Sequence, residues 1–555
     1  MISIQPTDSS ENIASKNETK TASTKIEQSI ENTTRHAFFV GAGILLSRII
    51  GVLRQRIFAH YFGGLSPEGD AFAAAFRIPN FLQNVFGEGA LSASLIPVYA
   101  SLIAKGDDKE ANRVANAILT LLAFITSSIV LFGILLTPYL IGFIAPGFTG
   151  EKRELTIHLV KILFPGAGLL VMSAWCLGIL NSHRKFFLSY SAPVIWNCAI
   201  ITALTLFGNQ VELSKLAEIT AWGSVIGSGL QFVIQLPTVL FLIRRIAPIF
   251  DFVSESVRTV IKNFFPVFFS RGVVQISAYI DTLIATLLGD GPTNLLQFSQ
   301  SLYTLPVSLF GMSISVAELP AMASALGDDA EISAQLRQRL DNGLKRIAVF
   351  IIPSSMAFLA LGDVLTAAVY QTGKFGHKDV LYVWGALAGS SVGLLASTLG
   401  RLYSSTYYAL KDTRTPLKFA VVRVILTTIL GYFCAIYVPP MLNLEIQWGM
   451  VGLTLTAGIA GWVEFLLLRH TLNQKIGKTG LPKDFIIKLW VSAIIAAIIG
   501  WVIKMMIGST LHPILIAISV TIPYGVTYFL IAAFFRIKEA QVIVDRFIHK
   551  FSNWF

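Results

Sequence analysis

The chain has 555 residues, of which 54% are hydrophobic and 14% are charged. Soluble domains carry roughly 25% charged residues, so this composition, with a mean hydropathy of +0.66, excludes an ordinary soluble domain. In a soluble protein the net charge of +11 would suggest nucleic-acid binding. In a membrane protein it indicates basic cytoplasmic loops beside anionic lipids. We therefore expect an all-α polytopic membrane protein that contacts membrane lipids and binds no nucleic acid.

The first segment, residues 1–35, is polar and nearly free of aromatic side chains. Such a segment cannot bury enough apolar surface to order itself, and it lacks the apolar stretch of a secretory signal. We expect it to be a disordered cytoplasmic tail.

Apolar stretches long enough to cross a bilayer then recur up to residue 535. The pattern predicts about fourteen transmembrane helices. Their approximate ranges are 36–61, 70–104, 114–144, 155–181, 187–207, 217–243, 262–289, 295–325, 346–370, 380–409, 417–438, 448–468, 485–507 and 513–535.

Loop charge and a weak internal repeat indicate how these spans are organised. Basic residues concentrate in alternate loops, which places both termini in the cytoplasm. Residues 78–102 resemble residues 305–326, and residues 180–193 resemble residues 409–416. Two six-span halves with the same topology are typical of transporters. The expected domains are a six-helix half at 36–243, a second at 244–472, two extra transmembrane helices at 473–535 and an amphipathic cytoplasmic tail at 536–555.

Charged residues gather in the first two spans, which meet at a Gly/Ser/Pro turn at 63–69. Ions within the hydrocarbon are costly, so such residues usually face a wet cavity or a partner. The candidates there are Arg48, Arg54, Asp70, Arg77 and Glu88. They form the strongest functional signal in the chain.

The arginines of the first span predict a basic lining for an anionic substrate. A guanidinium suits phosphate because its planar fork donates two parallel hydrogen bonds. We assign Arg48 and Arg54 to this lining, whereas Arg56 fits better as a side chain that snorkels to the interface.

In the second span Asp70 lies at the helix start, where the helix dipole favours a carboxylate. Arg77 precedes Pro79, which allows a bend beside a charge. Glu88 lies mid-span between two glycines and needs a partner across the cavity. A charged residue beside a bend is typical of a cavity or a gate.

Later spans contain further isolated ions. Arg271 and Asp281 lie in the span at 262–289, and Asp281 is a candidate cation or proton site. Arg423 and Glu464 lie alone in their spans, where structural pairing is as good an explanation as function. The sequence contains no enzyme motif and no metal-ligand spacing, so we expect a transporter without catalytic residues, metal or cofactor.

Several motifs resemble the MurJ (MviN) family of bacterial lipid II flippases, within the multidrug/oligosaccharidyl-lipid/polysaccharide exporter superfamily. They are SRIIGVLRQ at 47–55, DAFAAAFRIPNFLQNVFGEGALSASLIPVY at 70–99, APGF at 145–148, QTGKFG at 371–376 and LKDTRTPLK at 410–418. The resemblance covers residues 36–535. It implies transfer of the lipid-linked peptidoglycan precursor from the cytoplasmic to the periplasmic leaflet of the inner membrane, by alternating access around a cationic cavity.

The resemblance also assigns individual residues. Arg48, Arg54, Asp70 and Glu88 match functional positions, with Arg54 as a ligand of the diphosphate and with Asp70 and Glu88 as candidates for a gate or charge network. The chain departs from the family at Gln83, where an arginine is common, and at Gln300 and Ser301, where many members carry an Asp-Arg pair. From their placement alone, Arg77 and Arg271 are candidates to replace the missing substrate-binding arginines. Asp281 fits a sodium site found in some members, but Gly431 stands where the family tends to place Asn.

Three alternative functions stay open from the sequence. The first is a flippase for another polyprenyl-diphosphate glycan, which the departures at Gln83, Gln300 and Ser301 leave open and the long match at 70–99 argues against. The second is a membrane scaffold for cell-wall synthesis proteins, which does not explain ions within the membrane. The third is a drug or cation antiporter, which would have an acidic lining.

Overall fold

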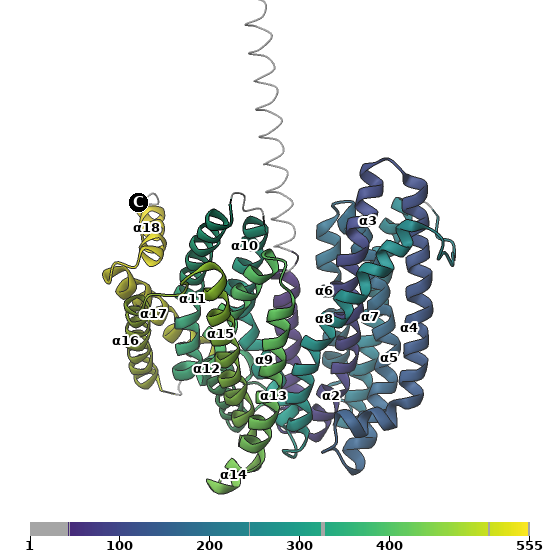
Figure 1. Ribbon diagram of the computed structural model, residues 1–555. Coiled ribbons are helices and arrows are strands. Elements are labelled where there is room, and N and C mark those ends of the chain that lie inside the picture. The colour runs from purple at the N-terminus through teal and green to yellow at the C-terminus, as the bar shows by residue number, and fades with distance from the viewer. Residues whose placement is uncertain (1–42, 44, 244, 324–327, 509–510, 553–555) are drawn as a thin grey trace, which may run out of the picture.

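The computed structural model describes residues 43, 45–243, 245–323, 328–508 and 511–552 (Figure 1). These residues form helices joined by loops, with no strand among them. Residues 45–62 are helical, and the elements that follow are α2 (Pro67–Leu82), η1 (Gln83–Leu91), α3 (Ser92–Ala104), α4 (Asp108–Ile144), α5 (Gly150–Ser182), α6 (Phe186–Phe207), α7 (Leu213–Ile243), α8 (Glu255–Thr286), α9 (Pro292–Pro306), η2 (Val307–Met312), α10 (Ser313–Ala323), α11 (Asp329–Tyr370), α12 (His377–Ala409), α13 (Arg414–Ile436), α14 (Val438–Met441), η3 (Ile446–Trp448), α15 (Gly449–Ile476), α16 (Lys483–Ile507), α17 (Pro513–Phe534) and α18 (Lys538–Ser552). The tail predicted at 1–35 lies outside the described residues.

Eleven helices in the described part of the chain are long and apolar enough to cross a membrane. The expected all-α multi-pass membrane protein is thereby confirmed, and the number fourteen stays a prediction. The remaining predicted spans correspond to helical stretches at 45–62, 67–104 and 255–286, which are not among the eleven. These three stretches contain every candidate site residue named above. The charged residues that indicate a functional site also lower the mean hydropathy of the three helical stretches that contain them.

The helices form two groups that lie side by side in Figure 1. In one group α5 packs against α2, α4 and α7, and α6 packs against α7. In the other, α12 packs against α11 and α15, and α13 packs against α15, while α16 and α17 cover α11. α8 contacts η1, α3 and α4 of the first group as well as α9, α13 and α15 of the second. The proposed boundary at residue 243 therefore stays a prediction.

Both copies of the predicted repeat contain a π-helical segment. η1 separates α2 from α3, and η2 separates α9 from α10. π-Helical turns widen the helix locally and are frequent at functional sites. The other pair of similar segments, residues 180–193 and 409–416, also shares a backbone conformation. Arg184 and Lys411 both adopt a φ of 59° in the turn that follows a helix.

The two ends of the bundle differ in charge. Successive long helices run in opposite directions, so the loops at 105–107, 183–185, 245–254, 410–413 and 477–482 share one end. Lys and Arg concentrate in these loops and the adjoining helix turns, and we call this end the basic-loop end. The loops at 145–149, 208–212, 287–291, 371–376 and 442–445 share the other, which we call the opposite end.

Candidate functional site

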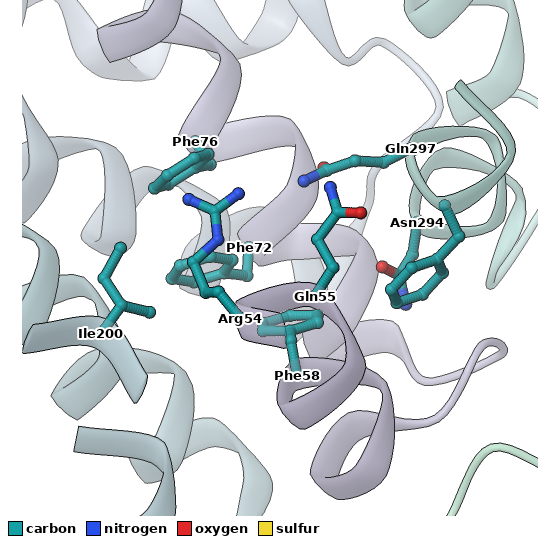
Figure 2. A pocket seen from close by; sticks show the side chains of 9 residues that line it. Arg54, Gln55, Phe58, Phe72, Phe76, Ile200, Asn294 and Gln297 are labelled. Atoms are coloured by element: carbon teal, nitrogen blue, oxygen red, sulfur yellow. The ribbon is translucent and has the colours of Figure 1, made fainter. Parts of the chain in front are cut away.

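A pocket lies between the two groups of helices, around Arg54 (Figure 2). The 45–62 helix, α2 and α6 supply its lining from one group, and α9 supplies it from the other. The lining residues are Arg54, Gln55, Phe58, Phe72, Phe76, Ile200, Asn294, Gln297 and Phe298. Aromatic rings thus surround one cation and three amide side chains.

The guanidinium of Arg54 is held by aromatic rings rather than by a carboxylate. Its central carbon lies 5.1 Å from the ring centre of Phe76 and 5.5 Å from that of Trp196. These two rings are stacked on one another, with centroids 5.5 Å apart and planes 5° apart. The Trp196 indole N–H donates to the backbone carbonyl of Ser224, which fixes the ring. Cation–π contacts attract a guanidinium without using its N–H groups.

One nitrogen of Arg54, Nη1, is buried and has no hydrogen-bond partner among the described residues. A buried charged donor that lacks an acceptor is costly. An anionic ligand entering the pocket would supply acceptors and balance the charge. The site is therefore chemically suited to a phosphate or carboxylate.

Gln55 connects the pocket to the second group of helices. Its amide Nε2 donates to the hydroxyl of Ser301 at 2.6 Å, and its Oε1 accepts from the hydroxyl of Tyr370 at 3.0 Å. In Figure 2 the amides of Gln55 and Gln297 point toward one another, and the Oε1 of Gln297 is buried without a partner among the described residues. Ser301, one of the three departures, thus joins neutral hydrogen bonds where the family resemblance leads one to expect charge.

Asp70 lies at the opposite end, fully buried between the two groups. Its carboxylate accepts hydrogen bonds from the backbone N–H groups of Gly291 at 2.7 Å and Asn294 at 2.8 Å. The Nζ of Lys152 lies 2.7 Å from Asp70 and 2.9 Å from Asp290. A carboxylate at the first turn of α9 is stabilised by the helix dipole and by unsatisfied backbone donors.

Further hydrogen bonds close the same end. The side-chain amide of Asn294 donates to the carbonyl of Gly63 at 3.0 Å. The N–H of Gly64 donates to Asp379 at 3.1 Å. The N–H of Lys374 donates to the carbonyl of His60 at 2.8 Å. Together with Asp70, these contacts join the 45–62 helix and the turn at 63–69 to α9, α12 and the loop at 371–376.

Arg56, for which the sequence favours a snorkelling side chain, contacts the end of a helix in the other group. Its Nη1 donates to the carbonyls of Ala368 at 2.6 Å and Val369 at 2.8 Å, in the last turn of α11. The last carbonyls of a helix have no partner within the helix and carry partial negative charge. A cation from the neighbouring group satisfies them here.

The remaining predicted residues are not gathered into the pocket. Arg48 is exposed and makes no ion pair or hydrogen bond with the described residues. Arg77 and Asp281 lie near enough to interact electrostatically, and the carbonyl of Arg77 accepts from the hydroxyl of Tyr279 at 2.7 Å. One oxygen of Asp281 is buried without a hydrogen bond to the described residues. The side chains of Glu88 and Arg271 lie outside the described residues.

The structure adds a group of ions that the sequence reasoning treated incompletely. Arg423 and Glu464, which lie alone in their spans, pair with each other at 3.1 Å across α13 and α15. Arg401 of α12 lies within electrostatic range of both and was missed. The signal was available, because Arg401 is the only charged residue in the apolar run LLASTLGRLYSSTYYAL.

Comparison with known sequences identifies relatives along nearly the whole chain. The family described as lipid II flippase MurJ matches residues 58–536. The lipid II flippase MurJ of Burkholderia cenocepacia is 29% identical over 452 residues, covering 80% of this chain and 84% of that protein. The probable lipid II flippase MurJ of Rickettsia prowazekii is 29% identical over 510 residues, covering 87% and 95% respectively.

Solved structures match the fold. A lipid II flippase MurJ in an inward closed conformation aligns with a TM-score of 0.73 at 24% identity, over 90% of this chain and 99% of that one. An inward-facing multidrug resistance MATE family transporter of the MOP superfamily aligns with a TM-score of 0.63 at 18% identity, over 77% and 95%. An outward-facing MATE transporter aligns with a TM-score of 0.54 at 17% identity, over 79% and 96%.

Proposed function

The chain belongs to the lipid II flippase MurJ family, and from this premise we propose that it moves lipid II across the bacterial inner membrane by alternating access. Transport of lipid II starts in the cytoplasmic leaflet and ends in the periplasmic leaflet. Family membership and a helical fold shared with inward-facing and outward-facing transporters support the proposal.

The observation that carries the proposal is the position of Arg54. A guanidinium with an unpaired buried nitrogen faces a pocket that both groups of helices line. The diphosphate of a polyprenyl-linked substrate supplies the acceptor oxygens that this nitrogen lacks, and a planar fork binds them well. Arg54 is thus the proposed diphosphate ligand. Arg48, Arg77 and Arg271 are further proposed substrate-binding residues that extend the cationic lining.

The contacts at the opposite end correspond to a closed gate. If the basic loops face the cytoplasm, this end faces the periplasm, and both chain termini lie inside. The carboxylate of Asp70 holds α2 against α9 there, which supports its assignment to a gate. Opening toward the periplasm must separate the two groups of helices at this end. Glu88 as part of the charge network, Asp281 as a cation site and the two six-helix halves remain parts of the same proposal, as do cell-wall synthesis proteins as partners.

Complementation tests the function directly. A bacterium depleted of its own lipid II flippase would receive the intact chain, Arg54→Ala or Arg54→Lys. Rescue by the intact chain and loss of rescue with Arg54→Ala at equal membrane expression are expected. Arg54→Lys keeps the charge without the planar fork, so we expect partial rescue. Arg258→Gln is the matched control, because Arg258 is an exposed arginine whose Nε bonds only the carbonyl of Phe252 among the described residues.

Failure of the intact, correctly inserted chain to rescue would contradict lipid II transport. The same variants would then be tested on other polyprenyl-diphosphate glycans, for which the neutral residues Gln83, Gln300 and Ser301 would be the specificity determinants. Rescue by Arg54→Ala equal to that by the intact chain would contradict the assigned role of Arg54.

A further inference from the structure

Arg401 lies deep in the second group of helices. It precedes the last residue of α12, Ala409, by eight residues, which is about 12 Å along a helix axis. A guanidinium at this depth in a membrane helix is costly unless it meets water, a counter-ion or a ligand. The side chain is nevertheless exposed, so the surface around it is accessible.

The accessible surface at Arg401 faces inward, toward α9. Val392, which is 41% exposed, precedes Arg401 by nine residues and therefore points to the opposite side of the helix. Ser397 precedes Arg401 by one turn and shares its face. The hydroxyls of Ser397 and Tyr303 of α9 form a hydrogen bond of 2.9 Å. Gln300, three residues before Tyr303, is also exposed.

The charges near Arg401 do not balance. Arg401 interacts electrostatically with Tyr303, Arg423 and Glu464. The carboxylate of Glu464 is already paired with Arg423 at 3.1 Å. Arg401 has no ion pair or hydrogen bond of its own within the described part of the chain. Two cations therefore share one anion, and a net positive charge remains on an inward-facing polar surface.

We propose that Arg401 binds a second anionic group of the transported lipid, distinct from the group held at Arg54. The ligand chemistry is a phosphate or carboxylate oxygen. Glu464 engages Arg423 at 3.1 Å and leaves the guanidinium of Arg401 available. The inference rests on the proposed function and adds a contact from the second group of helices, where Gln300 and Ser301 supply no charge.

Binding measurements on the purified full chain test this proposal. Wild type and Arg401→Gln would be titrated in nanodiscs with two lipids, namely lipid II, which carries a diphosphate and peptide carboxylates, and undecaprenyl diphosphate, which carries no carboxylate. Because a hydrogen bond to a charged group is lost, we expect lipid II to bind Arg401→Gln about 10- to 100-fold more weakly. Arg401→Lys should retain part of the affinity, and Arg258→Gln should bind as wild type does.

The two lipids distinguish the source of the anion. A similar loss with both would assign a phosphate to Arg401, and a loss with lipid II alone would assign a carboxylate. Unchanged affinity of Arg401→Gln for both lipids, with wild type binding lipid II, would overturn the inference. If wild type itself bound neither lipid, the proposed function would fail instead.

Glu464→Gln gives a second measurement that separates binding from folding. It removes the anion that Arg423 engages, so the local positive charge rises by one. Affinity for lipid II should stay the same or increase, although the ion pair is lost. A purely structural role for the three residues predicts weaker binding in Glu464→Gln and Arg401→Gln alike, and that result would contradict the proposal.

Discussion

The carboxylate of Asp70 accepts a hydrogen bond of 2.8 Å from the backbone N–H of Asn294, which lies 224 residues away in sequence. Together with its bond to the N–H of Gly291, this contact caps the N-terminus of α9 with a side chain from α2. Pro292 occupies the first turn of α9 and has no N–H to satisfy. The cap of one helix is thus supplied by a helix of the other group, so opening this end leaves backbone donors unpaired.

Asp70→Asn should weaken this closure. The asparagine side chain still accepts a backbone hydrogen bond, but it loses the ionic bond to Lys152. Charged hydrogen bonds contribute about 1.5–3 kcal/mol, so the population open at this end should rise about 10- to 100-fold. Distance distributions between spin labels on the loops at 208–212 and 371–376 measure that population.

The control for this variant is Glu445→Gln. Glu445 pairs with Lys378 at 2.9 Å at the same end, but both side chains are more than half exposed. Exposed pairs contribute little, so the distances should match those of wild type. An equal shift in Glu445→Gln and Asp70→Asn would contradict a specific role for Asp70.

Trp196→Leu should weaken substrate binding without removing the charge. The indole ring and Phe76 hold the guanidinium of Arg54, and a cation–π contact contributes roughly 0.5–2 kcal/mol, so affinity for lipid II should fall about 2- to 30-fold. Titration of wild type and Trp196→Leu with lipid II in nanodiscs measures the effect. Trp222→Leu is the comparison, because Trp222 of α7 is 49% exposed and outside the pocket. Equal affinities for all three proteins would argue against the aromatic support.

Lys504→Met should destabilise the attachment of α16 to α11. The ammonium of Lys504 hydrogen-bonds to the carboxylate of Asp363, whose other oxygen is buried without a partner among the described residues. Removing the cation leaves a poorly satisfied carboxylate. A double-mutant cycle of Lys504→Met and Asp363→Leu by thermal unfolding in detergent should give a coupling energy of about 0.5–3 kcal/mol. A coupling energy of zero would show that the pair contributes nothing to this interface.

The loop at 410–413 should make stability depend on acid pH. The Nζ of Lys475 lies 2.6 Å from the carboxylate of Asp412, and this bond, with those from Thr415, holds the pKa of Asp412 well below its usual value. A carboxyl group whose pKa is lower in the folded state stabilises the fold above its unfolded pKa, about 4, and loses this contribution as the pH falls through the folded value.

Asp412→Asn removes that contribution at neutral pH. Thermal midpoints in detergent should therefore differ between wild type and Asp412→Asn at pH 7 and converge as the pH is lowered below about 4. Asp484→Asn is the control, because Asp484 is 77% exposed beside Lys488. A difference that is independent of pH would show that the carboxylate charge is not the cause.

Hydropathy and composition alone identify a helical, multi-pass membrane protein and the residues that carry costly charge. Hydropathy operates over consecutive residues, so spans and loop charges are readable without coordinates. Arg54 could be identified as a candidate because an arginine within an apolar run is energetically costly unless it meets water or a partner. The two π-helical segments lie within the two stretches of similar sequence, residues 78–102 and 305–326.

Which charges are paired depends on how the helices pack. Arg423 and Glu464 are 41 residues apart, and Asp70 and Lys152 are 82 residues apart, so no local pattern relates them. The free energy of an ion within a membrane depends on what lies a few ångströms away in space. Helix packing supplies the neighbours of each ion. It places the Arg56 side chain at the C-terminal end of α11 and the Asp70 side chain at the N-terminal end of α9, between the two groups of helices. It leaves Arg54 and Arg401 without an ion pair among the described residues.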